Sequence, residues 1–390
     1  MLHVLYLVHD VSDPAVRRRI IMLKAGGAQV TLAGFRRTAS AVADVEGLQP
    51  IDLGPTRDGR FAQRLAAIMK AVVSTGSKLG SMPRPDLIIA RNLEMLALAR
   101  RARSAFQATV PIVYECLDIH RLLLRDDSLG WAMRGAERFL ARDVKLLVTS
   151  SPAFIANYFK PFGQVAAPVE LLENKHFEPA AASLDDRITA ENPVAPPWRI
   201  GWFGALRCRH SLELLAEFSR RLDGRFEIVL RGRPALSEFP DFHGFVQSEP
   251  WLSFGGPYRN PEDMAAIYHE VHFSWAIDFF EQGLNSEWLL PNRLYEGCRF
   301  GAVPISMGTT ETGRFLDRQG IGVLLSEATP EALEAAVGTM EQHRFETLRA
   351  RVLARNPRTW SHDRADCRAF VEKLRGLTAA PGPYAAEALA

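Results

Sequence analysis

Short apolar segments alternate with amphipathic segments along most of the chain. Residues 2–8 form a continuous apolar run, which is typical of a strand buried in a parallel sheet. Asp13 and Pro14 then supply the cap and the first turn of a helix. A second apolar run follows at 30–35. This order of strand, helix and strand predicts a parallel sheet with helices packed on its faces.

The alternation continues to residue 175 and begins again after residue 197. Residues 176–197 are rich in alanine and proline, which is typical of a linker. Two such blocks predict an α/β protein with two Rossmann-like domains, 1–175 and 198–358, that face a central cleft. A closing helix at 359–377 is expected to pack back on the first domain. Further strands are expected at 86–90, 110–117, 145–149, 198–203, 226–230, 272–276, 303–306 and 321–325. Further helices are expected at 93–105, 152–159, 211–222, 261–271, 291–300 and 330–340.

Composition adds a cellular location to this picture. The chain of 390 residues is 47% hydrophobic and 24% charged, which suits a globular protein of two domains. Residues 1–8 lack a basic leader, and no apolar run reaches the roughly 18 residues of a membrane span. The four cysteines lie far apart without a Cys-x-x-Cys pair, which favours a reducing compartment and argues against structural zinc. We therefore expect a cytoplasmic protein.

The charge is divided unevenly between the two halves. Residues 1–175 carry 24 Lys and Arg against 16 Asp and Glu, a net of +8, whereas the rest carry 23 against 29, a net of −6. A basic first half indicates an anionic partner, although compositional drift between two domains would give the same asymmetry. The bases are not interleaved with an aromatic platform, so nucleic acid is not expected. The chain contains no G-x-G-x-x-G and no P-loop, which removes the main support for dinucleotide or ATP binding.

One basic segment, residues 57–84, is also apolar. Phe61, Leu65, Ile68 and other apolar residues lie between its bases, and Asp58 is its one acidic residue before Arg84. Such a stretch is typical of a helix that lies on an anionic membrane, and equally of a domain helix with a solvated basic face. Its bases are Arg57, Arg60, Arg64, Lys70, Lys78 and Arg84.

The segment 290–305 carries the clearest chemistry. Pro291 begins a helix, whose first turn offers free N–H groups and the positive end of the helix dipole to an anion. Asn292 and Arg293 lie in that turn, and Glu296 follows on the same helix face. A phosphate at the helix start would place an attached ribose about one turn along, where a carboxylate can accept its hydroxyls. An ordinary helix with a surface Arg–Glu pair is the alternative.

Here the sequence resembles a known family. Pro-Asn-Arg-Leu-Tyr-Glu at 291–296, followed by Gly-Ala-Val-Pro-Ile at 301–305, resembles the donor-site motif of the GT-B fold glycosyltransferases, especially the group that includes family 4. The resemblance implies that Glu296 binds the ribose of a nucleotide-diphosphate sugar, a UDP- or GDP-sugar, and that Arg293 binds its diphosphate. It covers essentially the whole chain.

A second segment is similar to the same family. Ile-Gly-Trp-Phe-Gly-Ala-Leu at 200–206 resembles the first strand of the family's nucleotide domain, where a glycine-rich turn and a nearby base meet the diphosphate. The resemblance places Gly204 at that turn and makes Arg207 or Arg209 the base.

The sequence departs from the family at the donor sugar. Family 4 usually has two glutamates separated by seven residues, but the position eight before Glu296 is Trp288. Glu287 is one residue off, and Glu281 lies further back. The contact with the donor sugar, and a retained or inverted outcome, are therefore not assigned. The chain has no Asp-x-Asp, so no metal and no other cofactor is expected, and arginines with the helix N-terminus take the charge of the leaving diphosphate.

An inverting transfer also needs a general base in the first domain, because an acceptor hydroxyl is a weak nucleophile. The candidates at expected strand ends are Asp118, with His120 close behind, then Glu94 and the His9–Asp10 pair. A histidine or aspartate in such a place is more often a helix cap or a satisfied hydrogen-bond partner.

The resemblance implies a glycosyltransferase that moves a sugar to a glycan or lipid-linked acceptor in exopolysaccharide or surface polysaccharide synthesis. With the basic first half, this points to peripheral contact with the anionic inner face of the membrane. Two alternatives remain open at this point. One is a sugar-nucleotide epimerase or hydrolase of the same fold, and the other is a protein that binds a nucleotide sugar without catalysis.

Overall fold

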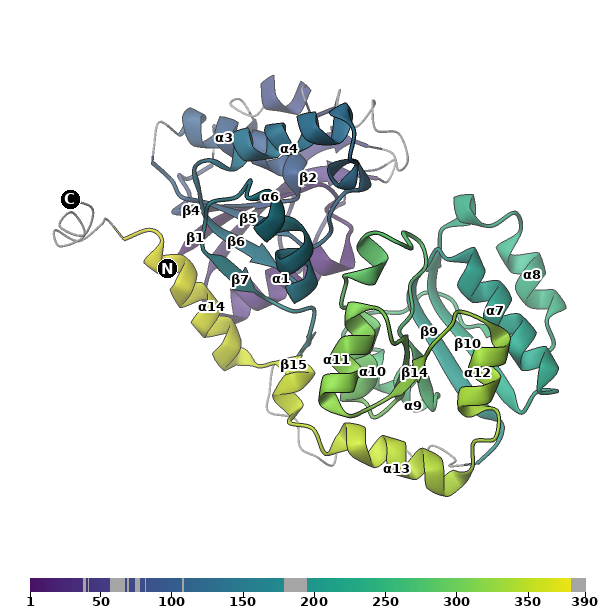
Figure 1. The fold of residues 1–390 in the computed structure, drawn as a ribbon. Coiled ribbons are helices and arrows are strands. Elements are labelled where there is room, and N and C mark those ends of the chain that lie inside the picture. The colour runs from purple at the N-terminus through teal and green to yellow at the C-terminus, as the bar shows by residue number, and fades with distance from the viewer. Residues whose placement is uncertain are drawn as a thin grey trace. The chain divides into compact units, whose positions relative to one another are not determined.

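The computed structural model describes residues 1–37, 40, 42–56, 67–68, 70–73, 78–80, 82–106, 109–178 and 195–379. The chain divides into two compact units, Met1–Leu172 with Asp363–Ala390, and Glu173–His362. Each unit contains its own parallel sheet with helices on both faces (Figure 1). The predicted α/β fold class is confirmed, whereas the central cleft stays a prediction.

The first unit is built on seven parallel strands in the order β3-β2-β1-β4-β5-β6-β7. The strands are β1 (His3–Val8), β2 (Gln29–Arg36), β3 (Ile51–Pro55), β4 (Leu87–Arg91), β5 (Ile112–Cys116), β6 (Val144–Thr149) and β7 (Val169–Leu171). Every residue of β1 is buried, because a run without a polar face needs cover on both sides. The longer helices are α1 (Pro14–Ala25), α3 (Leu93–Ala105), α4 (Ser128–Ala141) and α14 (Arg364–Gly376). In Figure 1, α3 and α4 lie on one side of this sheet and α1 with α14 on the other.

Helix α14 returns the end of the chain to the first unit, where it packs on α1. A Cβ atom added to Gly26, at the end of α1, would lie 2.4 Å from the carbonyl oxygen of Cys367. The Arg19 guanidinium of α1 lies over the ring of Phe370, 5.5 Å from its centroid. This close approach explains why α1 ends in a residue without a side chain.

The second unit is built on six parallel strands in the order β11-β10-β9-β12-β13-β14. The strands are β9 (Trp198–Leu206), β10 (Phe226–Pro234), β11 (Leu252–Phe254), β12 (Phe273–Trp275), β13 (Val303–Met307) and β14 (Val323–Leu325). The helices are α7 (Arg209–Arg221), α8 (Phe242–Ser248), α9 (Met264–His269), α10 (Asn292–Arg299), α11 (Glu311–Gln319), α12 (Pro330–Val337) and α13 (Gln342–Leu353). Trp198, Trp202 and Trp275 are fully buried in its core.

Two expected elements differ in the structure. The expected helix at 152–159 is divided in the structure. A short helix α5 (Pro152–Phe154) is followed by a π-helix (Ile155–Phe159) and a short helix α6 (Lys160–Phe162). The expected linker begins with strand β8 (His176–Phe177), which pairs with β15 (Ser361–His362) because the His176 N–H donates to the Trp360 carbonyl at 2.9 Å. Residues 179–194 of that linker lie outside the described residues.

Candidate functional site

The order of the strands marks one point in each sheet. In the first unit the chain runs from β1 to β2 and β3 on one side of β1, and then crosses to β4 on its other side. In the second unit the same reversal occurs at β9, with β10 and β11 on one side and β12 on the other. Ligands of such sheets bind beyond the carboxyl ends of the strands at this switch point. The side chains that follow β1, β4, β9 and β12 are therefore the ones to consider.

Helix α10 holds the predicted carboxylate of the second unit. The helix begins directly after Pro291, which provides no side-chain cap, although one N–H of the first turn donates to the Pro291 carbonyl at 3.0 Å. Glu296 is buried and accepts hydrogen bonds from Asn260 Nδ2 at 2.7 Å and from the Tyr268 hydroxyl at 3.4 Å. Burial, together with the Glu296 carboxylate, raises the pKa of the nearby Tyr258 above its usual range. Both of these hydrogen bonds to Glu296 come from neutral donors.

Two arginines meet a carboxylate at the switch point of the second sheet. Arg207 directly follows β9, and its Nη2 lies 3.2 Å from Oδ2 of Asp278, which comes after β12. The buried Arg293 of α10 donates from Nη2 to the Ile277 carbonyl at 2.6 Å. Burial opposes the charged form of Asp278, but Arg207 and Arg293 lower the pKa of this carboxyl overall. The structure therefore brings Arg207, one of the two arginines that the resemblance offered, to the same carboxylate as Arg293. That they bind a diphosphate stays a prediction.

The Arg293 side chain has an unused donor. Its Nε is buried and finds no hydrogen-bond partner among the residues that the structure describes. Unpaired buried donors are rare in folded proteins and call for an explanation. An anionic ligand at the start of α10 would provide the missing acceptor.

Glycine allows strands β9 and β10 to approach closely beside these arginines. Gly204 and Gly232 are register partners, with φ of 114° and 132°, values that favour glycine. A Cβ atom on Gly232 would lie 1.9 Å from the Gly204 carbonyl oxygen. The sequence predicted Gly204 as a turn glycine. It did not indicate that Gly204 packs directly against Gly232 of the neighbouring strand.

The other predicted donor-side residues have positions or partners of their own. Arg209 begins α7 and pairs with Glu213 at 2.6 Å on the exposed helix surface. Asn292 is the half-buried first residue of α10. Glu287 accepts a hydrogen bond from the Gly283 N–H at 3.0 Å and so closes a local turn.

In the first unit, His9 follows β1 and lies among charged residues. Its Nε2 is 3.9 Å from Oδ2 of Asp13, and its Nδ1 is 3.3 Å from Nδ2 of Asn92. Burial and the Arg91 guanidinium lower the pKa of His9, against the opposite effects of Asp13 and Glu94. The imidazole is therefore neutral near pH 7 and able to accept a proton.

A buried ionic network holds Asp13 in place beside His9. Arg91, the last residue of β4, donates from Nη2 to Asp13 Oδ2 at 3.3 Å and from Nη1 to the Tyr6 hydroxyl at 3.2 Å. Glu115 of β5 accepts from Tyr6 at 2.5 Å and from Arg19 Nε at 2.5 Å. Although burial opposes charge on both carboxylates, Arg91 lowers the pKa of Asp13, and Arg19 with Arg91 lowers that of Glu115. Both carboxylates are thus ionised.

Asn92 has a strained backbone. Its φ is 70° and its ψ is 166°, and it caps α3 without a side-chain hydrogen bond to that helix. Its amide is instead directed to His9. Residues other than glycine rarely adopt such angles, and where they do the strain often lies at a functional site.

The remaining acceptor-side candidates have other partners. Asp10 accepts from the N–H and hydroxyl of Ser12 at 2.9 and 2.7 Å and lies 3.2 Å from Arg37 Nε. His120 caps a short 3₁₀ helix (Arg121–Leu124), because its Nδ1 accepts from the Leu122 N–H at 3.3 Å. Asp118 is exposed, and Glu94 lies in the first turn of α3.

The sequence reasoning missed Arg91, Asn92, Asn260 and Asp278. Arg91 and Asn92 directly follow an expected strand, which is a signal that the sequence did contain. Asp278 likewise follows the expected strand at 272–276. The signal for Asn260 is absent, since its partner Glu296 lies 36 residues away.

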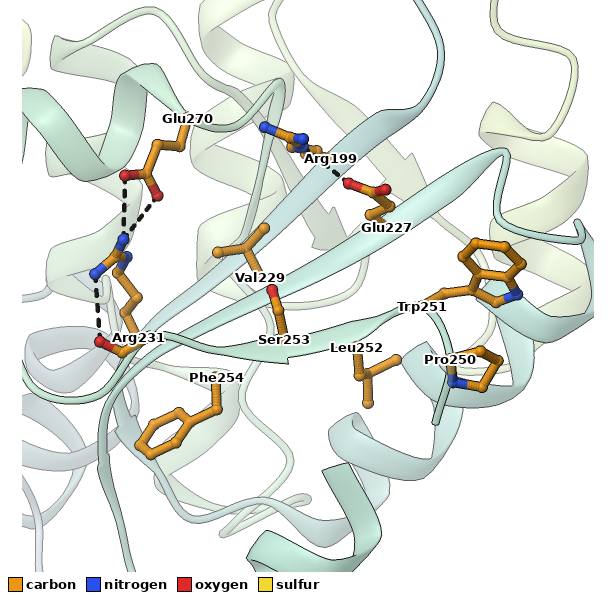
Figure 2. Close-up of a pocket in the computed structure, with 11 residues that line it drawn as sticks. Arg199, Glu227, Val229, Arg231, Pro250, Trp251, Leu252, Ser253, Phe254 and Glu270 are labelled. Atoms are coloured by element: carbon orange, nitrogen blue, oxygen red, sulfur yellow. Dashed lines mark hydrogen bonds and ion pairs between the residues drawn. The ribbon is translucent and has the colours of Figure 1, made fainter. Parts of the chain in front are cut away.

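A hollow of about 430 Å³ lies elsewhere in the second unit, along β10 and β11 (Figure 2). Figure 2 shows that both of its arginines are paired, Arg199 with Glu227 at 2.9 Å and Arg231 with Glu270 at 2.9 Å. The hollow follows β10 and the edge strand β11, away from the switch point between β9 and β12. Since ligands of such sheets bind at the switch point, the hollow fits the donor less well than the Arg207–Arg293 cluster.

Within the described part of the chain, no three His, Cys, Asp or Glu side chains gather closely enough to hold a metal ion. No helix there is long and apolar enough to cross a membrane.

Comparison with known proteins identifies the family. The chain is 57% identical over 382 residues to the succinoglycan biosynthesis protein ExoL of Rhizobium meliloti (strain 1021), a match that covers 97% of this chain and 94% of that protein. The chain belongs to the ExoL family. No protein-family model matches the chain.

Solved structures identify the fold of this ExoL-family chain. It is similar to sucrose-phosphate synthase from Thermosynechococcus elongatus, with a TM-score of 0.71 and 14% identity, over 96% of this chain and 98% of that one. It is also similar to Anabaena HepE in complex with UDP and glucose, with a TM-score of 0.66 and 13% identity, over 96% and 100% of the two chains. The predicted GT-B glycosyltransferase fold is confirmed.

Proposed function

We propose that this ExoL-family chain is a glycosyltransferase of exopolysaccharide synthesis, which moves a sugar from a nucleotide-diphosphate sugar to an acceptor hydroxyl. The 57% identity to a succinoglycan biosynthesis protein supports the pathway class. The observation that carries the proposal is the meeting of Arg207 and Arg293 at Asp278, at the switch point of the second sheet.

The second unit binds the donor. Glu296 accepts the ribose hydroxyls, and the hydrogen bonds that Asn260 and Tyr268 donate to its carboxylate hold it in position for them. Arg293 and Arg207 bind the diphosphate, with the N–H groups that begin α10. The donor class is a UDP- or GDP-sugar, and HepE, a protein of this fold, is known in complex with UDP and glucose.

The first unit binds the acceptor, and His9 is its general base. The imidazole is neutral and half-buried, and Asp13 can stabilise the imidazolium that forms. His9 suits this role better than His120, whose Nδ1 already caps a helix, and better than Asp118, whose carboxylate is exposed and weakly basic. A basic group near neutral pH is the more effective catalyst.

In the proposed transfer, the acceptor oxygen forms a bond to the anomeric carbon of the donor while the bond from that carbon to the diphosphate oxygen breaks. The hydroxyl proton goes to His9. Arg207 and Arg293 stabilise the negative charge on the leaving nucleoside diphosphate.

The acceptor is a lipid-linked glycan, and the protein works in the cytoplasm at the inner membrane face. The net charge of +8 on residues 1–175 supports contact with anionic lipid. Most of the basic segment 57–84, including Arg57, Arg60 and Arg64, lies outside the described residues, and its role in this contact stays a prediction. Lys70, Lys78 and Arg84 are described and exposed.

A panel of UDP- and GDP-sugars, each incubated with and without lipid-linked acceptor, tests the proposal. We expect nucleoside diphosphate to be released only when the acceptor is present. Release without acceptor would instead identify a hydrolase or an epimerase that leaks nucleotide. Binding of a donor without any turnover would identify a non-catalytic protein.

A further inference from the structure

Helix α4 presents large aromatic side chains to solvent. Its buried residues are Gly130, Glu137 and Ala141, whereas Trp131 is 75% exposed and Phe139 is 57% exposed. A surface helix normally turns its apolar stripe to the core and its polar residues to water. The outward face of α4 therefore needs a reason other than folding of the first unit.

The inward side of α4 carries one buried carboxylate among residues that are mostly apolar. Glu137 is buried and accepts hydrogen bonds from the Tyr114 hydroxyl at 2.7 Å and from the Tyr158 hydroxyl at 2.5 Å. These two tyrosines anchor the helix and fix which side faces outward. With Glu137 inside, Trp131 and Phe139 lie on the solvent side of the helix.

The outward residues form one continuous apolar strip. Trp131, Gly135 and Phe139 follow each other at steps of four residues, so they lie in a row along the helix. Ala132 and Ala136 are exposed beside this row. Leu129, which is 44% exposed, extends the strip at the helix start.

Basic residues lie along one edge of this strip. Arg138 and the following Arg142 are exposed, and the Arg142 guanidinium lies 4.7 Å from the centroid of the Phe139 ring. Glu137 is the one acidic residue of the helix, and it is buried. The charges that α4 presents to solvent are therefore all positive.

We propose that this α4 face, consisting of Leu129, Trp131, Phe139, Arg138 and Arg142, seats the protein on an anionic phospholipid bilayer with the helix lying in the interface. An apolar helix face with aromatic residues and an arginine edge matches the chemistry of that interface. A second copy of the chain fits less well, because a two-fold contact would bring the arginine edges of two such faces together. The proposal rests on the proposed function only in that a lipid-linked acceptor makes this location useful.

Trp131 provides a direct probe, since it alone among the seven tryptophans, all of which the structure describes, is exposed. The full chain is mixed with vesicles of phosphatidylglycerol and phosphatidylcholine whose acyl chains carry bromine, which quenches tryptophan on contact. We expect quenching of the wild type and its loss in Trp131→Phe. If the wild type binds these vesicles without quenching, contact lies elsewhere and the proposal is wrong.

Co-sedimentation with the same vesicles measures the energy of the contact as a change in affinity. The double variant Trp131→Gln/Phe139→Gln should lose at least about tenfold in vesicle affinity. Arg138→Gln/Arg142→Gln should also bind more weakly, and its affinity should respond less to salt. Leu236→Gln in the second unit is the matched control, because Leu236 is 59% exposed, and its affinity should not change.

Three results would overturn the proposal. These are unchanged vesicle affinity of the Trp131→Gln/Phe139→Gln variant, absence of vesicle binding by the wild type, and a dimer of the wild type that the same variant abolishes. Transfer to a water-soluble analogue of the acceptor is measured separately. If the wild type does not transfer sugar to that analogue, the proposed function is wrong. If the wild type transfers sugar but its tryptophan is not quenched by the vesicles, the membrane face alone is wrong.

Discussion

Two carboxylates in the second unit have different partners, and this separates their roles. Glu296 accepts hydrogen bonds from the side chains of Asn260 and Tyr268, both of which are neutral donors. Asp278 lies 3.2 Å from Arg207 and feels Arg293 as well, so its charge is already balanced. We infer that Glu296 contacts the donor and that Asp278 orients the arginines.

Replacing Glu296 by alanine should weaken donor binding. The change removes a charged acceptor of hydrogen bonds, and we expect a loss of about 1.5–3 kcal/mol in binding free energy. Calorimetry with the nucleoside diphosphate on the folded variant measures it. Glu270→Ala is the control, because Glu270 pairs with Arg231 in the hollow of Figure 2 and should leave the affinity unchanged. Equal affinities of wild type and Glu296→Ala would remove Glu296 from the ribose.

Replacing Asp13 by asparagine should move the pH profile of transfer. Asn is also a good helix cap, so α1 should keep its start. Because Asp13 raises the pKa of His9, its loss should lower that pKa further. The base then stays neutral to lower pH, and the acid limb of kcat/KM should shift to lower pH while the rate on the plateau falls. An unmoved acid limb would show that His9 is not the titrating base.

At the scale of elements, continuous apolar runs were the most reliable signal. The runs at 2–8 and 198–203 predicted β1 and β9, and both strands are central in their sheets. Helix α10 begins and ends within one residue of its prediction, because Pro291 and Gly301 mark its limits. Strands β7 and β11 were missed because each has only 3 residues, too few to show an alternation of apolar and polar positions.

Helix α4 was missed for a different reason. Its large aromatic residues face outward, and the buried Glu137 interrupts its core-facing side, so no clear apolar stripe was present to predict it. The site was predictable only where its residues share one element, as Arg293 and Glu296 do on α10. Contacts such as that of Asn92 with His9, 83 residues apart, depend on the folded sheet and leave no local pattern.

The close approach of β9 and β10 yields a test at this scale. Gly232→Ala should lower the free energy of unfolding by at least about 1 kcal/mol more than Gly54→Ala, because both have φ above 120° but only Gly232 faces a backbone oxygen. Added Cβ at Gly54 meets no described atom within 4 Å. Urea denaturation of both variants gives the comparison. Equal losses would mean that backbone strain alone, and not the strand contact, requires glycine at 232.

At the scale of the whole molecule, the first half of the chain is basic and the second half is acidic. The first unit takes in α14 from the end of the chain, although Glu173–His362 intervene. Its basic character was predictable by counting residues, but the outward apolar face of α4 was not. The arrangement of the two units relative to a shared ligand follows from the proposed reaction and stays a prediction.

Transfer should continue in excess EDTA. Arg207, Arg293 and the start of α10 can take the charge of the leaving diphosphate, and the sequence has no Asp-x-Asp. Initial rates with and without chelator should agree once chelation of substrate is controlled. A rate that falls with EDTA and returns with a divalent cation would show that the arginines do not suffice.

The most direct test of the glycosyltransferase assignment is the mass of the acceptor lipid after incubation with a UDP- or GDP-sugar. The account predicts a gain of one sugar residue with the wild type, and little or none with Glu296→Ala at donor concentrations that the wild type saturates. An unchanged acceptor mass with every donor and a folded wild-type protein, or an equal gain with Glu296→Ala, would contradict it.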